Sequence, residues 1–195
     1  MRELTNGQKL QQAYRRHVLP YSDYIQLAVT LTLKQVDNIR VKRFTNYGND
    51  CYEFKSYLDE EKLVGLVRYF TALLTHEIYG NKAKHKNKKH FAMPLVITVV
   101  EGRNTYKHTH LHLAIGNVPQ EKLGDIEALI KRIWNSCDFA NKQVCVKHVK
   151  NNVGWLGYIT KEVGYTDNDA LDICASTIPP FIQQRICTES RLRTA

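Results

Sequence analysis

The chain has 195 residues, 43% of them hydrophobic, which is enough for one domain with its own core. Its formal net charge of +9 favours an anionic partner, above all nucleic acid. No apolar run is long enough to cross a bilayer, residues 1–20 contain no signal-peptide core and the five cysteines form no C-x-x-C pair, so we expect a cytoplasmic protein with reduced thiols.

The N-terminal part of the chain predicts an arm followed by a strand. Residues 1–24 show no clear periodicity, so we expect either a docked arm or a frayed end. Residues 25–34 alternate between apolar and small polar side chains, which is typical of a half-buried strand. Thr30 and Thr32 lie on the polar face, and their small size leaves space above the sheet, where we expect DNA to bind.

Residues 35–57 are expected to form a long polar connection with a turn at residues 47–50. Basic side chains are interleaved with aromatic ones, which suits single-stranded nucleic acid because phosphates need cations and bases need flat rings to stack on. An irregular loop whose aromatic side chains fill the core explains the pattern equally well. The basic residues that we assign to DNA contact here are Arg40, Lys42 and Arg43.

A helix and a lysine-rich loop follow this connection. Residues 58–79 place apolar side chains at helical spacing, with Asp59 as the N-cap and Gly80 as the end. Residues 81–90 have no apolar period and carry five lysines, so we expect a solvated loop suited to phosphate contact. A solvated surface without any such contact is the alternative. The lysines that we assign to DNA contact are Lys82, Lys84, Lys86, Lys88 and Lys89.

The second half of the chain predicts three strands and two helices. Residues 94–101 form a continuous β-branched run, which fits a strand buried on both faces, and a turn joins it to a second strand at residues 108–116. Further elements are expected as helices at residues 119–136 and 152–163, a strand at residues 143–149 and a final element that packs on the body after residue 172.

The resulting order of elements defines the expected fold. Strands and helices alternate as β-α-β-β-α-β, followed by one more helix, which is the ferredoxin-like or RRM-like α+β arrangement. We expect an antiparallel sheet with helices on one face and one added helix. Residues 25–34 and 108–116 would be the central strands of that sheet.

Three histidines occupy alternate positions in the strand expected at residues 108–116. Because alternate residues of a strand share a face, His108, His110 and His112 line one face and leucines line the other. Imidazole is the commonest metal ligand in proteins. The hairpin also brings Glu101 near His110 and His112, and this set of two imidazoles and one carboxylate can hold Mg²⁺, Mn²⁺, Fe²⁺ or Zn²⁺.

The register of Glu101 leaves two possibilities open. Ile97 and Val99 share its face in a regular hairpin, so we expect a bulge or a strand end at Glu101. A carboxylate at the end of a hairpin that pairs with a lysine is the alternative to a metal ligand.

A tyrosine and a lysine lie on the helix expected at residues 152–163. Side chains three positions apart share a helix face, so Lys161 lies beside Tyr158. A phenol is a weak nucleophile at neutral pH because its ordinary pKa is about 10, and a neighbouring cation helps it. Tyr165 is expected to share this face two turns further on, but Lys161 makes Tyr158 the better candidate. The same spacing occurs by chance in many helices.

Three segments, in this order, resemble the motifs of HUH endonucleases of the replication-initiator (Rep) type. Residues 27–32 (LAVTLT) resemble the first motif, residues 110–112 (HLH) the His-hydrophobic-His metal motif, and residues 158–161 (YITK) the tyrosine helix. Glu101 resembles the third metal ligand of some viral Reps. The tyrosine follows the histidines, as in Reps, whereas relaxases of conjugation carry it near the N-terminus. Two departures are that Glu162 stands where phage-type initiators have a second tyrosine, and that the sequence contains no P-loop.

The resemblance implies a nickase that cleaves and rejoins single-stranded DNA, or an origin hairpin, to start rolling-circle replication. Its metal, Mg²⁺ or Mn²⁺, would be held by His110, His112 and Glu101. Tyr158 would form a 5′-phosphotyrosine link, and Lys161 would orient or neutralise the phosphate. His108 would flank the site and contact DNA. A separate helicase would cooperate, and the gene would belong to a phage, plasmid or other mobile element.

Three alternatives remain at this point. A single-tyrosine transposase shares the motif order but usually has glutamine where this chain has Lys161. A non-catalytic nucleic-acid-binding module does not need Tyr158, Lys161 and paired histidines together. A metal enzyme acting on a small molecule does not need a net charge of +9. In every case we expect an arm at residues 1–24, the main domain at residues 25–165 and a C-terminal extension at residues 166–195.

Overall fold

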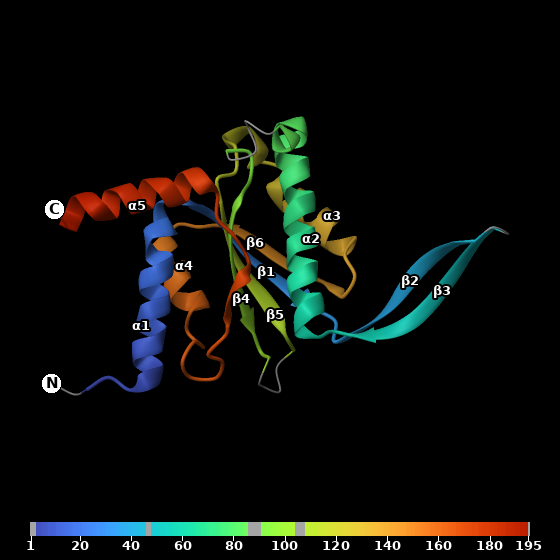
Figure 1. The fold of residues 1–195 in the computed structure, drawn as a ribbon, viewed down its shortest axis with the longest axis horizontal. Helices are drawn as coiled ribbons and strands as arrows, with labels where there is room; N and C mark the ends of the chain where they lie inside the picture. The colour runs from blue at the N-terminus through green and yellow to red at the C-terminus, as the bar shows by residue number, and fades with distance from the viewer. Residues whose placement is uncertain (1–2, 46–47, 86–90, 104–107, 195) are drawn as a thin grey trace.

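The computed structural model describes residues 3–45, 48–85, 91–103 and 108–194, and every statement below concerns those residues. Figure 1 shows how the elements are arranged. In chain order they are α1 (Asn6–Val18), the 3-10 helix η1 (Leu19–Tyr24), β1 (Ile25–Leu33), β2 (Val36–Thr45), β3 (Gly48–Tyr57), α2 (Glu60–Tyr79), η2 (Gly80–Lys84), β4 (Leu95–Glu101), β5 (His110–Gly116), η3 (Gln120–Lys122), α3 (Ile126–Asn135), β6 (Ala140–His148), α4 (Asn152–Ile159), β7 (Leu171–Thr177) and α5 (Pro180–Thr194).

The main sheet has five strands in the order β6-β1-β5-β4-β7, and each neighbouring pair is antiparallel. β1 and β5 are neighbours inside the sheet, as expected for the first and third strands of a ferredoxin-like order. The expected α+β fold class is therefore confirmed. β7 adds a fifth strand along the outer edge of β4, so the C-terminal segment belongs to the same sheet.

Helices cover both faces of this sheet. α2 and α3 lie on one face, while α1, α4 and α5 lie on the other (Figure 1). Each face has its own apolar core: Leu111, Leu113 and Ile115 of β5 pack toward α2 and α3, and Ala114 packs toward α4. Adjacent residues of β5 therefore belong to different cores, because successive side chains of a strand point to opposite faces.

The patterns that predicted the central elements agree with the burial. Every second residue of β1 is buried, and all seven residues of β4 are buried. Helix α2 begins after Asp59, whose carboxylate accepts a hydrogen bond from the backbone N–H of Lys62, and it ends at Gly80 with a φ of 55°.

Within the described residues, no helix is long and apolar enough to span a bilayer.

Residues 35–57 differ from the expected connection. They form a two-stranded ribbon, β2–β3, that projects away from the body (Figure 1). Cross-strand partners share a face, so Val41 and Tyr52 lie on one face with Phe54, and Arg40 lies opposite Glu53 on the other. The aromatic side chains do not fill the core, since Tyr52 is 50% and Phe54 is 51% exposed. The sequence pattern does not predict this ribbon, because its strands pair with each other rather than bury a face.

Four other elements depart from the expected boundaries. Residues 6–18 form a helix, with a capping box between Thr5 and Gln8, where no periodicity was recognised. The helix expected at residues 119–136 is split into η3 and α3. Helix α4 ends at Ile159, so Tyr165 lies beyond it and does not share its face. Leu171–Thr177 is a strand, because pairing with β4 overrides its weak local pattern.

Two glycine substitutions test this packing in opposite directions. An added Cβ at Gly116 would overlap the backbone carbonyl of Tyr24, whereas a Cβ at Gly65, inside α2, meets no atom within 4 Å. Gly116→Ala should therefore lower the free energy of unfolding by about 2 kcal/mol. Gly65→Ala should raise it by about 0.5–1 kcal/mol, because alanine favours a helix over glycine. Urea unfolding measures both, and shifts of the same sign would contradict the packing.

Candidate metal centre and active site

The hairpin of β4 and β5 brings together one carboxylate and two imidazoles. Glu101 pairs with His110 and Val99 pairs with His112 in a regular register, so all four side chains share one face of the sheet. Glu101 is the last residue of β4. Of the two expected explanations for its position, the strand end is the correct one, and β4 and β5 pair without a bulge.

The donor atoms of Glu101, His110 and His112 all lie within 4.8 Å of one another, and this group can hold a metal ion. Glu101 Oε2 is 2.8 Å from His112 Nε2 and 3.6 Å from His110 Nε2. Glu101 and His112 are buried, and His110 is half-buried. The predicted ligand set thus meets in space.

The second nitrogen of each imidazole has its own partner. His112 Nδ1 lies 3.0 Å from the hydroxyl of Thr30, its cross-strand partner on β1. His110 Nδ1 donates to the backbone carbonyl of His108 at 3.0 Å. Both Nε2 atoms are therefore turned toward Glu101, and such outer partners are what orient histidine ligands around a metal. The side chain of His108 itself is exposed and outside the group.

Burial and charge shift the pKa values of these groups. Burial opposes ionisation of Glu101, but the hydrogen bond from Lys161 and the charge of His112 outweigh it and lower the pKa of Glu101 to about 2. Burial, together with the charge of His110, lowers the pKa of His112 to about 4. At neutral pH the site thus presents an ionised carboxylate and a neutral imidazole, which are the forms that bind metal ions.

Tyr158 and Lys161 reach the same group from α4. The Tyr158 ring lies 5.6 Å from the His112 ring, centroid to centroid, and the phenol is 48% exposed. Lys161 Nζ lies 3.9 Å from the centroid of the Tyr158 ring and 3.0 Å from Glu101 Oε2. The two residues are neighbours as predicted, although Lys161 lies past the end of α4, in a turn where its N–H donates to the Tyr158 carbonyl.

Trp155 belongs to this site and was missed in the sequence analysis. Its indole stacks on the Tyr158 ring, with centroids 5.5 Å apart and planes 16° apart, and it also meets the edge of His112 at 5.7 Å. The available signal was its position one helical turn before Tyr158. Trp155 thereby limits the directions in which the phenol can turn.

The residues assigned to DNA contact are dispersed. Thr30 supports His112, and the Thr32 hydroxyl donates to the Gln143 carbonyl. Arg40 is exposed on the ribbon. The side chains of Lys42 and Arg43, and all of Lys86, Lys88 and Lys89, lie outside the described residues.

The described lysines of the basic loop lie far from the group of Glu101, His110 and His112, which is called the metal group below. Lys82 and Lys84 are exposed in η2, which adjoins the start of β4, whereas Glu101 is at its other end (Figure 1). Seven strand residues span about 20 Å. The structure therefore does not bring Lys82 and Lys84 to the group of Glu101, His110 and His112.

Lys147 is a cation closer to the metal group than Lys82 and Lys84, and it was not predicted from the sequence. β6 is the outer strand beside β1, and its residues Cys145 and Lys147 pair with Thr30 and Ala28. Because paired residues share a face, Lys147 lies on the same side of the sheet as His112, and it is exposed. The β6–β1 part of this face is thus open and carries a positive charge.

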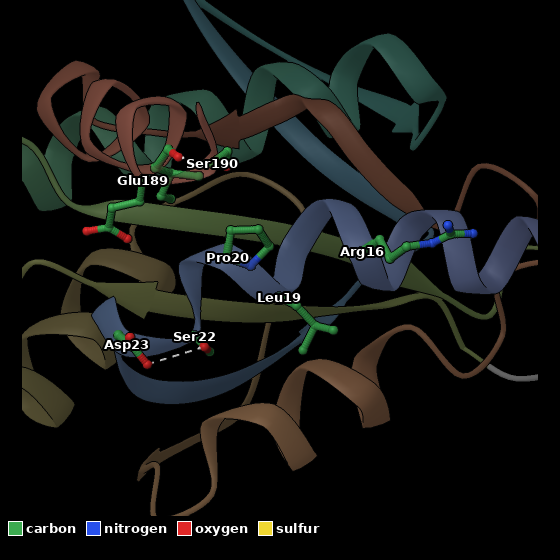
Figure 2. A pocket seen from close by; sticks show the side chains of 8 residues that line it. Arg16, Leu19, Pro20, Ser22, Asp23, Glu189 and Ser190 are labelled. Atoms are coloured by element: carbon green, nitrogen blue, oxygen red, sulfur yellow. Dashed lines mark hydrogen bonds between the residues drawn. The ribbon is translucent and has the colours of Figure 1, made fainter. Parts of the chain in front are cut away.

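A separate hollow of about 420 Å³ lies between η1 and α5 (Figure 2). Its lining is mixed and includes Arg16, Asp23 and Glu189. None of the metal-group residues lines it, so it is not part of the site.

Comparison of the chain with protein-family models, curated proteins and solved structures finds no match.

The hydroxyl of Thr30 should control metal affinity. Thr30→Val keeps the shape of the side chain but removes the partner of His112 Nδ1, so we expect Mn²⁺ binding to weaken by about tenfold. Isothermal titration calorimetry measures this, and Thr32→Val is the matched control because its hydroxyl bonds β6 rather than the cluster. Equal affinities in the wild type and Thr30→Val would contradict the assignment of His112 as an oriented ligand.

Proposed function

We propose that this chain is a Rep-type HUH endonuclease, which nicks and rejoins single-stranded DNA through a tyrosine ester. The observation that carries the proposal is the convergence of Tyr158 and Lys161 on the Glu101–His110–His112 group. A nucleophile on α4, a cation in the turn that follows it and a metal-binding set on β4 and β5 thus meet on one face of the sheet. The order of their motifs along the chain supports the same class.

Tyr158 is the proposed nucleophile. Its oxygen forms a bond to the phosphorus of the scissile phosphodiester, and the bond from phosphorus to the 3′ oxygen breaks. The phenol loses one proton and the departing 3′ oxygen gains one, so the products are a 5′-phosphotyrosine and a free 3′-hydroxyl. One ester is exchanged for another, so the reverse reaction can rejoin a strand.

Lys161 is the proposed phosphate partner. Its ammonium lies over the Tyr158 ring, so it would meet the phosphate that the phenol attacks. Contacts with Tyr158 and Glu101 raise the pKa of Lys161 although burial opposes this, which keeps the side chain charged. A divalent cation, Mg²⁺ or Mn²⁺ in this proposal, supplies Lewis-acid polarisation of the phosphate when His110, His112 and Glu101 hold it.

A non-catalytic binding module explains the site less well. A surface that only binds DNA needs exposed cations and stacking rings. It does not need a buried carboxylate that holds two imidazoles and an ammonium beside a half-exposed phenol. In this proposal the protein acts at a replication origin of a mobile element, with single-stranded DNA or an origin hairpin as substrate and a separate helicase as partner.

Covalent capture of DNA tests the proposal. Wild-type protein with labelled single-stranded origin DNA and Mn²⁺ should yield an adduct that survives denaturation. Tyr158→Phe should yield none, because its ring keeps the stacking on Trp155 but has no nucleophilic oxygen. Tyr165→Phe is the matched control, since Tyr165 is 63% exposed and lies beyond α4.

Three results would refute the proposed function or part of it. An adduct that persists in Tyr158→Phe excludes the nucleophile, and cleavage that persists in a His110→Ala/His112→Ala double variant excludes the metal assignment. Absence of any adduct with wild-type protein across origin-derived strands excludes the nickase.

The open β6–β1 face should bind the DNA near the nick. With a short oligonucleotide centred on the nick site, Lys147→Gln should reduce the slope of log affinity against log salt by about 0.7, which corresponds to one lost phosphate contact on a single strand. Lys84→Gln should leave that slope unchanged, because η2 lies at the far end of β4, and should reduce it only with longer DNA. Fluorescence anisotropy at several salt concentrations measures both, and the reverse ranking would contradict this path.

A further inference from the structure

One face of α1 is directed at the end of the tyrosine helix. Gly7, Gln11 and Arg15 are spaced four residues apart, so they form one stripe along α1. All three contact α4 or the segment that follows it. From the sequence alone, this part of the chain is expected only to be an arm.

Gln11 supplies the central contact of this stripe. Its side-chain amide Nε2 donates to the carbonyl of Thr160 at 3.1 Å and to the carbonyl of Lys161 at 3.0 Å. Arg15 adds longer hydrogen bonds, both 3.4 Å, to the Gly157 carbonyl and the Thr160 hydroxyl. Carbonyls at and just after the end of a helix have no partner within it, so Gln11 supplies donors to the Thr160 and Lys161 carbonyls that α4 does not supply.

A close backbone contact fixes the start of the same stripe. A Cβ at Gly7 would overlap the Gly164 carbonyl, and a Cβ at Gly164 would overlap the Gly7 carbonyl. Gly164 also has a φ of 80°, which suits glycine. The turn that carries Lys161 is therefore held by α1 at residue 161 and again at residue 164.

We propose that Gln11 is a positioning residue for strand cleavage, an inference that rests on the proposed function. Gln11 holds the backbone of Lys161, and the ammonium of Lys161 in turn bridges Glu101 Oε2 and the Tyr158 ring. The Lys161 ammonium can contact Glu101 Oε2 and the Tyr158 ring together only when the turn after α4 holds one conformation. Gln11 sets that conformation without touching DNA or the metal ligands.

The docking of α1 does not depend on Gln11. Val18 is buried in the core on this face, and Leu10 and Tyr14 pack against it along a neighbouring stripe of the helix. A substitution at Gln11 should therefore leave α1 in place and change only the order of the turn. Because the docking of α1 and the order of the turn depend on different residues, the role of Gln11 can be tested without displacing the helix.

The experiment uses the full-length chain carrying Gln11→Met, which keeps the length of the side chain but donates no hydrogen bond. We expect single-turnover adduct formation with saturating single-stranded DNA and Mn²⁺ to slow by about tenfold or more. The Kd for DNA should stay within about twofold, since Gln11 lies outside the proposed DNA path. Hydrogen exchange of the amides at residues 160–164 should accelerate, because that turn loses its support.

Gln12→Met is the matched control, because Gln12 is the neighbouring glutamine on the exposed side of α1. It should match the wild type in all three measurements. Gln11→Glu, which has the same shape but no donor, should slow adduct formation at least as much as Gln11→Met.

Two outcomes would overturn the inference. An unchanged adduct rate in Gln11→Met, with faster exchange at residues 160–164, shows that cleavage does not need the ordered turn. A Kd for DNA that weakens as much as the rate shows that Gln11 acts on binding. If wild-type protein forms no adduct, the proposed function fails, and amide exchange alone decides whether Gln11 orders the turn.

Discussion

The buried carboxylate of Glu101 is the interaction on which the site depends. An ionised carboxylate is costly to bury unless it is paired and hydrogen-bonded. Its Oε2 atom meets His112 Nε2 at 2.8 Å and Lys161 Nζ at 3.0 Å, and His110 completes the group. These contacts require the regular register of β4 and β5 and the turn after α4 at the same time. The chemistry of the site therefore depends on the position of the Glu101 carboxylate.

Two elements from the N-terminal part of the chain support the groups around this charge. β1 contributes the Thr30 hydroxyl to His112, and α1 contributes Gln11 to the backbone of Lys161. Helix α4, with Trp155 stacked on Tyr158, places the phenol at the rim of the buried group. The strands beside this rim, β6 and β1, remain open on the same face, so a strand of DNA can approach the phenol along them.

Local patterns predicted the elements whose burial is periodic. Alternation predicted β1 and β5, continuous apolar composition predicted β4, and the spacing of His110 and His112 predicted the group that can hold a metal ion. What local patterns did not predict depends on partners distant in the sequence. The β2–β3 ribbon buries no regular face, β7 becomes a strand by pairing with β4, and the contact of Gln11 with Lys161 joins positions 150 residues apart. The sequence did not predict that α4 ends before Lys161. A turn can hold Tyr158 and Lys161 side by side as a helix does, so their spacing does not distinguish the two.

The most direct test of this account is to identify the residue that becomes linked to DNA. After reaction with single-stranded origin DNA and Mn²⁺, nuclease trimming and tryptic digestion, mass spectrometry should find the nucleotide on the peptide of residues 151–161. Tyr158 is the only tyrosine in that peptide, so the fragment spectrum is unambiguous. Modification of Tyr158 is the result that the proposed function predicts. A nucleotide on any other residue, or none on this peptide, would contradict a site built around Glu101, His110 and His112.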